Sequence, residues 1–459
     1  MFNVKAAVVI WASIGLSLAQ TQVTVNVGST LQKIDGFGVS QAFGRAAEFQ
    51  ALAEGPRRKG LDYLFNTTTG AGFTIIRNRI GSKGADSILP NSPGSPTADP
   101  KYVWDRNDSG QVWFSKEAMG YGVKNIYADA WSAPGFMKTN GNEANGGYLC
   151  GVTGQTCSSG DWRQAFANML AQYVKYYQEE GIQVSHLGFL NEPDYTTSYS
   201  SMRSDGAQAA SFIPTLSKTL QSNNLSSVAL ACCDNMGWGT TRTTASALIS
   251  AGMESYLTLL TSHNYNGDPN SVISTRLKTW QTEACDLQSR WCTTWYSNGG
   301  ACEGLTWAGK IATGILNANL SAYIYWQGVE VNQQQASSYL VLSDGTEVFP
   351  SGRLWAMAMW SRFIRPGAYR VATSGSVSGV SVGAFKNTDG SVVGVLTNTG
   401  GSSQNVKLAL NGFTPNAAGA WLTDNSHQVA GVEVTLDGSA VTVAVPARSV
   451  VTVKLTEAS

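Results

Sequence analysis

The run Val184-Ser185-His186-Leu187-Gly188-Phe189-Leu190 opens directly into Asn191-Glu192-Pro193. A second short run, Lys278-Thr279-Trp280-Gln281-Thr282, ends in Glu283 in the same way. A carboxylate at the point where a buried strand becomes a loop is poorly placed for core packing. It is well placed for chemistry at the C-terminal mouth of a (β/α)8 barrel, where strand ends converge on one site.

Strand-like apolar runs alternate with helix-period runs from about residue 36 to residue 360, as βα units require. The helical pattern is clearest at Trp162–Glu180 and Glu303–Asn317. Continuous apolar strands are typical of a parallel sheet covered by helices. The sequence therefore predicts an α/β fold of the TIM-barrel type. Its eight expected strands are Asp35–Ser40, Phe73–Ile80, Asn125–Trp131, Val184–Leu190, Val228–Cys232, Leu257–His263, Thr279–Thr282 and Ala322–Gln327.

A different pattern follows Arg365-Pro366-Gly367. Short alternating strands such as Val380–Phe385, Ser391–Thr397 and Val450–Leu455 are separated there by Gly, Asn and Asp turns, which is typical of an all-β sandwich. We expect a leader over residues 1–19, an N-terminal strand over 20–35 that joins the sandwich, a catalytic barrel over 36–362, and a fused C-terminal β-sandwich side domain over 363–459.

The composition excludes several classes of partner. The formal net charge is zero and only 14% of residues are charged, which argues against a nucleic-acid surface. Beyond the leader, no apolar stretch reaches membrane-spanning length, so no membrane partner is expected. The three histidines are scattered and the cysteine spacing matches no zinc framework. We therefore expect a monomer that needs no metal and no organic cofactor.

The N-terminus resembles a secretory signal peptide. Lys5 supplies the positive charge, residues 6–18 are apolar, and Ser17-Leu18-Ala19 gives a small-x-small cleavage pattern before Gln20. A secreted, extracellular protein is the expectation. Asn-x-Ser/Thr acceptor patterns for glycosylation occur at Asn66, Asn107, Asn224 and Asn319.

Seven cysteines suit an oxidising compartment. Cys150 and Cys157 bracket a Gly-rich loop, and we expect a disulfide between them. Cys285, Cys292 and Cys302 cluster after Glu283, where a second bridge is expected without a defined pairing. The odd total leaves at least one thiol unpaired, and the partners of Cys232 and Cys233 stay open.

Short motifs occur in a fixed order along the chain: Gly36-Phe37-Gly38, Ile75-Ile76-Arg77, Trp131 to Asn140, Asn191-Glu192-Pro193, His263-Asn264-Tyr265, Thr282-Glu283-Ala284 and Tyr325-Trp326. In this order they resemble glycoside hydrolase family 30, and the resemblance spans nearly the whole mature chain. The segment from Ser40 to Phe49 is most similar to the fungal subfamily 7 branch, whose members act on xylan.

The resemblance implies a retaining glycosidase in which Glu192 is the acid/base and Glu283 is the nucleophile. Such a mechanism needs carboxyl groups about 5–5.5 Å apart, with the acid protonated and the nucleophile ionised. Taken alone, Asn191-Glu192-Pro193 also fits an ordinary helix-start turn. The neutral amide of Asn191 is suited to a sugar 2-hydroxyl.

The other motif residues are expected to line the same mouth. Arg77 is expected at the end of the second strand, where it would hold Glu283 charged, with a purely structural ion pair as the alternative. His263 and Tyr265 share one motif in the substrate site, and Tyr265 would donate to the nucleophile. Trp131 and Trp326 would form the base of the subsite that binds the cleaved sugar, and the alternative is that both rings only pack within the barrel.

Arg45 follows the first strand and is the residue that says most about the substrate. We expect its guanidinium to bind the carboxylate of a glucuronic acid branch on xylan. The alternative is a solvated charge at the start of a surface helix, with Glu48 nearby.

The leading hypothesis is a secreted hydrolase of xylan or glucuronoxylan that acts as an endo-xylanase, a glucuronoxylanase or a xylobiohydrolase. An endo-β-1,6-glucanase of the same family is the nearest alternative. A non-catalytic carbohydrate-binding protein is less favoured because both glutamates are present, and the mouth loops look unlike those of a glucosylceramidase. The choice between endo and exo action stays open, and the Ser82–Arg106 loop is the segment where a block to the chain end is expected.

Overall fold

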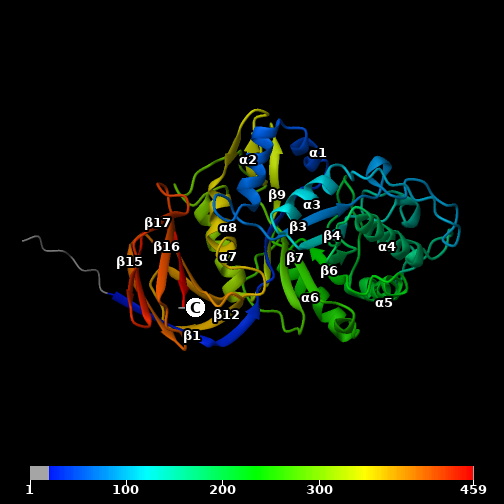
Figure 1. The fold of residues 1–459 in the computed structure, drawn as a ribbon. Helices are drawn as coiled ribbons and strands as arrows, with labels where there is room; N and C mark the ends of the chain where they lie inside the picture. Colours follow the sequence, from blue (N-terminus) through cyan, green and yellow to red (C-terminus); the bar gives the residue numbers. More distant parts are fainter. Residues whose placement is uncertain (1–19, 458–459) are drawn as a thin grey trace, which may run out of the picture.

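The computed structural model describes residues 20–457, so the predicted leader over residues 1–19 lies outside the described residues. Two bodies lie side by side: a barrel of strands and helices, and a β-sandwich formed by the C-terminal part of the chain together with the first strand (Figure 1). The predicted fold class is confirmed.

Eight parallel strands make the barrel, and each overlaps a predicted strand. Their order follows the chain, and β9 closes the sheet by pairing with both β2 and β8. The strands are β2 (Gly36–Ser40), β3 (Ile75–Ile80), β4 (Asn125–Ala130), β5 (His186–Gly188), β6 (Ala229–Asn235), β7 (Leu259–His263), β8 (Lys278–Glu283) and β9 (Ala322–Val331).

Helices cover the outside of the barrel: α1 (Arg45–Gln50), α2 (Glu54–Phe65), α3 (Gln111–Gly120), α4 (Arg163–Glu179), α5 (Gly206–Ser222), α6 (Trp238–Ser250), α7 (Gly304–Asn317) and α8 (Gly352–Ser361). The predicted alternation fails once, because residues 264–277 between β7 and β8 form no helix. That segment contains Gly267 and Pro269 among Asn, Asp and Ser residues, which favour turns.

The barrel interior changes from apolar to ionic towards its C-terminal mouth. Ile75 and Tyr127 belong to a buried apolar cluster contributed by six of the strands. Side chains two positions apart on a strand point to the same side. Arg77 and Asp129, two residues further along β3 and β4, therefore enter the interior above that cluster. Both are fully buried.

Strand β9 runs beyond its predicted end at Gln327 and reaches Val331. The extension pairs in parallel with β10 (Tyr339–Ser343), which pairs in turn with β11 (Val348–Pro350). This ribbon stands at the barrel mouth and brings Glu330 to the same cavity as Glu192 and Glu283.

The sandwich strands follow in the order β17-β16-β20-β14-β13-β12-β1-β15-β19-β18. They are β1 (Gln20–Lys33), β12 (Tyr369–Ser374), β13 (Val380–Lys386), β14 (Val392–Asn398), β15 (Gln404–Asn411), β16 (Ala417–Thr423), β17 (Ala430–Val432), β18 (Thr435–Asp437), β19 (Ala440–Val445) and β20 (Ser449–Thr456). Strand β1 lies antiparallel to β12 and parallel to β15. Helices α7 and α8 pack between the sandwich and the barrel.

Three disulfides are present in the described part of the chain. Cys150 is bonded to Cys157, Cys292 to Cys302, and Cys232 to its neighbour Cys233. The Cys285 thiol is free and buried. Within residues 20–457, no helix is long and apolar enough to cross a membrane.

Candidate active site

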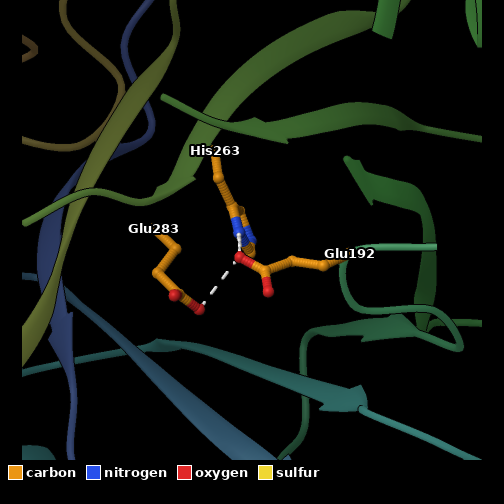
Figure 2. Close-up of side chains that lie close together, drawn as sticks. All are labelled: Glu192, His263 and Glu283. Carbon is orange, nitrogen blue, oxygen red and sulfur yellow. Dashed lines mark hydrogen bonds and ion pairs between the residues drawn. The ribbon is translucent and has the colours of Figure 1, made fainter. Parts of the chain in front are cut away.

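Glu192 and Glu283 meet at the C-terminal end of the barrel strands (Figure 2). Glu192 lies in the loop after β5, and Glu283 is the last residue of β8. Each is only 6% exposed. One carboxylate oxygen of each, together with a ring nitrogen of His263, lie within 4.8 Å of one another. The two glutamates that the sequence singled out therefore share one site.

Glu283 is held by one cation and one hydroxyl. Arg77 Nη1 donates to Oε2 at 2.6 Å, and the Tyr265 hydroxyl donates to Oε1 at 2.8 Å. The sequence predicted Arg77 at the end of the second strand, but Arg77 lies in the middle of β3. Both carboxylate oxygens of Glu283 thus accept strong hydrogen bonds, which favour the ionised carboxylate.

Glu192 has different partners. His263 Nδ1 lies 3.0 Å from Oε1, and the Tyr199 hydroxyl lies 3.4 Å from Oε2. The Glu192 backbone N–H donates to the Asp234 carbonyl at 2.8 Å. Glu192 has a φ of 48°, a conformation that only a surrounding network can hold for such a residue.

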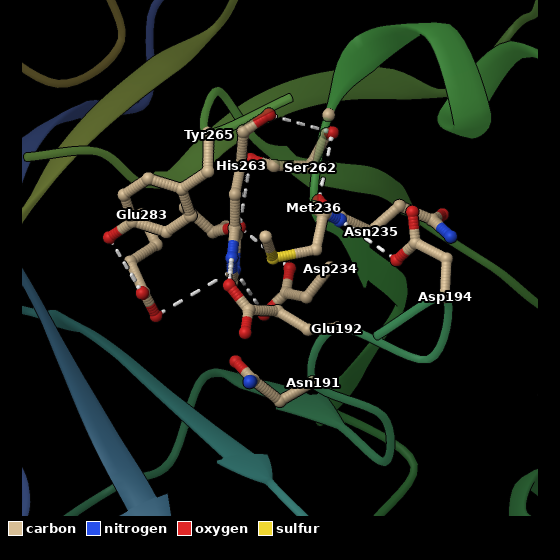
Figure 3. Close-up of polar contacts among 12 residues, drawn as sticks. Asn191, Glu192, Asp194, Asp234, Asn235, Met236, Ser262, His263, Tyr265 and Glu283 are labelled. Atoms are coloured by element: carbon tan, nitrogen blue, oxygen red, sulfur yellow. Dashed lines mark hydrogen bonds and ion pairs between the residues drawn. The ribbon is translucent and has the colours of Figure 1, made fainter. Parts of the chain in front are cut away.

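A buried ionic network lies beneath the two glutamates, and Figure 3 shows two of its members, Asn191 and Asp234. Arg77 Nη2 donates to Asp234 at 2.7 Å, to Asn191 Oδ1 at 2.7 Å and to Asp129 at 3.0 Å. Asp234 also accepts from the Thr282 hydroxyl at 2.6 Å. Because Asn191 turns its oxygen towards Arg77, its amide nitrogen stays free among the described residues as a donor for a ligand.

The network sets the charges of the site. Although burial acts to lower the pKa of His263, the carboxylates of Glu283, Asp234 and Glu192 raise it to about 10, so the ring is an imidazolium at neutral pH. Burial raises the pKa of Glu283, while His263 and Arg77 act against burial. Arg77 contacts Glu283 and not Glu192, so the two carboxyl groups have different electrostatic surroundings.

Glu192, His263 and Glu283 also form a group that could supply three ligands to a metal ion. The donor set fits a cation poorly. His263 must lose its proton to ligate, and Arg77 already occupies the Glu283 carboxylate at 2.6 Å. A divalent ion here would have to displace the His263 proton and would face the Arg77 guanidinium at short range.

The glutamates open into a cavity of about 560 Å³. Aromatic rings form one wall of it. Trp131 and Trp326 lie 5.9 Å apart between ring centroids, and Phe43 meets them edge-on at 5.6 Å and 6.0 Å. Phe43 has a φ of 56°, which is rare for a bulky residue and holds its ring in this wall. Such a wall offers apolar faces to a neutral ring.

Arg45 lines the rim of the same cavity at the start of α1. Its Nη1 donates to both oxygens of Glu48 at 2.9 Å and 2.8 Å, and its Nε lies 3.8 Å from Glu330. Nη2 has no partner among the described residues. Arg45 thus starts a helix beside Glu48 and also reaches the cavity, while its binding of a substrate carboxylate stays a prediction.

Arg77 and His263 were expected to bind substrate, but both are fully buried and neither lines the cavity. They act on the glutamates from below. Tyr265, Trp131 and Trp326 do line the cavity.

Sequence reasoning missed Asp234, Asp129, Phe43 and Glu330. Asp234 follows Cys232-Cys233 where β6 ends, so the strand-end criterion that found the two glutamates would also have found it. Asp129 was visible as the single acid in the apolar run Asn125–Ala130. Glu330 could not be found this way, because its position depends on the extension of β9.

Models of known families match both parts of the chain. One described as O-Glycosyl hydrolase family 30 matches residues 20–246, and one described as Glycosyl hydrolase family 30 beta sandwich domain matches residues 367–453. Among curated proteins, the chain is 28% identical over 176 residues to an endo-1,6-beta-D-glucanase from Trichoderma harzianum. That match covers 35% of this chain and 34% of the relative, about a third of its length.

Solved structures match over the full fold. The chain is 52% identical to the catalytic domain of a GH30 xylanase C from Talaromyces cellulolyticus, with a TM-score of 0.92 over 95% of this chain and 100% of that chain. It is 22% identical to a family 30 subfamily 8 xylanase from Clostridium acetobutylicum, with a TM-score of 0.73 over 95% and 100% of the two chains. At that lower identity the likeness shows the fold alone.

Proposed function

The chain belongs to glycoside hydrolase family 30, and we propose that it is a retaining xylanase that cleaves β-1,4-xylosidic bonds in xylan or glucuronoxylan by double displacement. The observation that carries the mechanism is the approach of Glu192 and Glu283, with one oxygen of each within 4.8 Å. Retaining enzymes hold the two carboxyl groups about 5–5.5 Å apart, whereas inverting enzymes leave about 6.5–9.5 Å for a water.

The first step uses the unequal partners of the two carboxyls. Glu283, kept ionised by Arg77 and Tyr265, attacks the anomeric carbon and forms a glycosyl ester as the glycosidic C–O bond breaks. Glu192 gives its proton to the departing oxygen. His263 occupies Oε1 of Glu192, so the proton is left on Oε2, the oxygen on the Tyr199 side.

The second step reverses the roles. Glu192, now ionised, takes a proton from a water, and the hydroxide oxygen bonds to the anomeric carbon as the ester to Glu283 breaks. Two inversions give net retention. Throughout, the imidazolium of His263 stabilises whichever glutamate is charged, since its ring nitrogens lie 3.0 Å from Glu192 and 3.8 Å from Glu283.

The choice of xylan rests on the extent of likeness. The xylanase C of Talaromyces cellulolyticus is 52% identical over its whole catalytic domain. The endo-1,6-beta-D-glucanase of Trichoderma harzianum is 28% identical over about a third of its length, and this supports β-1,6-glucan as the second candidate. The aromatic wall suits either neutral polysaccharide, because stacking on a sugar face needs no charge.

The free Nη2 of Arg45 supports a further preference for xylan that carries glucuronic acid. A branch carboxylate could accept a charge-assisted hydrogen bond there. Glu48 and Glu330 already face the same guanidinium, so this preference should be moderate.

We also propose secretion as a monomer, with a mature chain that starts near Gln20. The disulfides support an oxidising compartment. N-terminal sequencing of protein from the culture medium tests the leader, and a mature chain that still begins at Met1 would contradict it.

Reducing-sugar release from linear xylan, glucuronoxylan and β-1,6-glucan tests the substrate. We expect both xylans to be cleaved much faster than the glucan, and Glu192→Gln to lower the rate on xylan by about 10²- to 10⁴-fold. Glu283→Gln should abolish it. Faster cleavage of the glucan would make the second candidate correct, and no cleavage of any substrate would favour a binding protein.

A further inference from the structure

Asp234 lies close to Glu192 and His263 (Figure 3), and it also contacts Thr282 and Arg77, the two residues that support Glu283. It is fully buried near the end of β6, with a φ of 50°. We propose that Asp234 is the positioning residue that fixes Glu192 and Glu283 relative to each other, with a larger contribution than that of the neighbouring acid Asp129. The proposal rests on the assignment of Glu192 and Glu283 as the catalytic pair.

The Glu192 arm runs through the main chain. The Asp234 carbonyl accepts the Glu192 N–H at 2.8 Å, and both residues adopt the left-handed conformation. A second tie joins the same two loops, because the Met236 N–H donates to the Asp194 carboxylate at 2.9 Å. The loop after β5 is therefore fastened to the end of β6 at Glu192 itself and again two residues later.

The Glu283 arm runs through the side chain. Asp234 Oδ1 accepts from the hydroxyl of Thr282, the residue before Glu283, at 2.6 Å. Oδ2 accepts from Arg77 Nη2 at 2.7 Å, and the other amino group of Arg77 binds Glu283 at 2.6 Å. A single carboxylate thus fixes both the backbone before Glu283 and the cation on its carboxylate.

Asp129 provides an internal control. It shares Arg77 Nη2 with Asp234 and is equally buried, but its Oδ1 has no hydrogen-bond partner among the described side chains. Burial and Asp234 raise the pKa of Asp129 well above its ordinary value. Although burial opposes it, Arg77 and His263 hold the pKa of Asp234 well below the ordinary value. Asp234 thus makes two shorter contacts, to Thr282 and Arg77, where Asp129 makes one at 3.0 Å, so the two acids should contribute unequally.

Charged and titratable groups face Asp234 from five directions around the barrel: Arg77 on β3, Tyr127 and Asp129 on β4, Glu192 after β5, His263 on β7 and Glu283 on β8. Asp234 is one of the carboxylates that raise the pKa of His263. Without the Asp234 charge, His263 should lose its proton at a lower pH. The rate depends on the imidazolium that stabilises the charged glutamate, so the alkaline limb of the pH–rate profile should shift to lower pH.

The test compares Asp234→Asn with Asp129→Asn in the full chain. Asparagine keeps the size of the side chain and leaves the main-chain bond to Glu192 intact, so the first variant removes the carboxylate charge and one of the two oxygens that accept from Thr282 and Arg77. We expect it to lower kcat/KM on xylan by about 10²-fold, as misplacement of reacting groups does, mostly through kcat, and to shift the alkaline limb to lower pH. Asp129→Asn alters only the 3.0 Å contact to Arg77 and leaves the contacts of Asp234 to Thr282 and Arg77 in place, so it should lower kcat/KM by only about three- to tenfold.

Equal activities for the two variants, with unchanged pH profiles, would overturn the proposal. Should Asp234→Asn fail to fold, Thr282→Val removes the 2.6 Å contact and no charge, and a fall in kcat at constant KM is then expected. Wild-type activity in Thr282→Val would contradict the Glu283 arm. Failure of the proposed function looks different, because the wild type itself would then be inactive on xylan.

Discussion

Arg77 and Arg45 both lie within reach of several carboxylates, but at different depths. Arg77 is fully buried below the glutamates and binds Glu283 and Asp234 at 2.6 Å and 2.7 Å. Arg45 is at the cavity rim with 26% of its side chain exposed, and it contacts Glu48. Buried charges interact strongly because little water screens them, whereas rim charges are screened. Arg77 should therefore govern the reaction itself, and Arg45 should govern which substrates fit.

The largest difference in activity and stability between the two sites should appear when the same substitution is made at both. Arg77→Met leaves buried carboxylates without a cation, and we expect it to abolish xylan cleavage and to cost about 3–5 kcal/mol of unfolding free energy. Arg45→Met, a rim change, should cost within about 1 kcal/mol. Denaturant unfolding at neutral pH measures both.

The pH dependence of that loss has a definite sign. Without Arg77, the pKa values of the orphaned carboxyls rise in the folded state, so the variant takes up protons more readily than the unfolded chain. Its stability deficit should be largest at neutral pH and shrink as the pH falls. A deficit that is the same at pH 4 and pH 7 would mean that Arg77 acts through packing alone.

Arg45→Ala should separate branched from unbranched substrate. We expect kcat/KM on glucuronoxylan to fall by about 10- to 150-fold, the value of a charge-assisted hydrogen bond of roughly 1.5–3 kcal/mol, and nearer the lower end because Glu48 already pairs with Arg45. Linear xylan should be cleaved almost as before. Arg45→Lys keeps the charge without the planar fork and should lie between the two. Equal losses on both substrates would make Arg45 a structural support of the rim.

Glu330 should have the smallest effect. Burial raises its pKa to about 7, with Arg45 acting against burial. Below that pH Glu330 is neutral, and Arg45 is available to bind the carboxylate of a glucuronic acid branch. Above that pH the Glu330 carboxylate competes with the branch for Arg45. The preference for glucuronoxylan over linear xylan should fall by up to about fivefold as the pH rises through 7, the effect of roughly 1 kcal/mol for a screened pair. In Glu330→Gln the preference for glucuronoxylan should not change with pH. If the variant keeps the pH dependence of the wild type, Glu330 is not its cause.

Some of these features could be predicted from the sequence and others could not. Strands buried on both faces read as continuous apolar runs, so all eight barrel strands were found, and the strand-end carboxylates followed from them. The network around Arg77 was found only in part, because its members come from different strands and meet only when the barrel closes. No pattern around Asp129 and Asp234 in the sequence indicates which of the two contacts both Arg77 and Thr282. The ribbon that carries Glu330 depends on pairing between β9 and β10, which no local pattern indicates.

The most direct test of the central claim is the anomeric configuration of the first product. Proton NMR during the first minutes of xylan cleavage, before mutarotation, distinguishes the two anomers at the new reducing end. Because Glu283 is taken as the nucleophile and Glu192 as the acid/base, with carboxylate oxygens within 4.8 Å, the account predicts that the β-anomer forms first. An α-anomer at the earliest times would mean inversion by direct attack of water and would contradict the roles assigned to both glutamates.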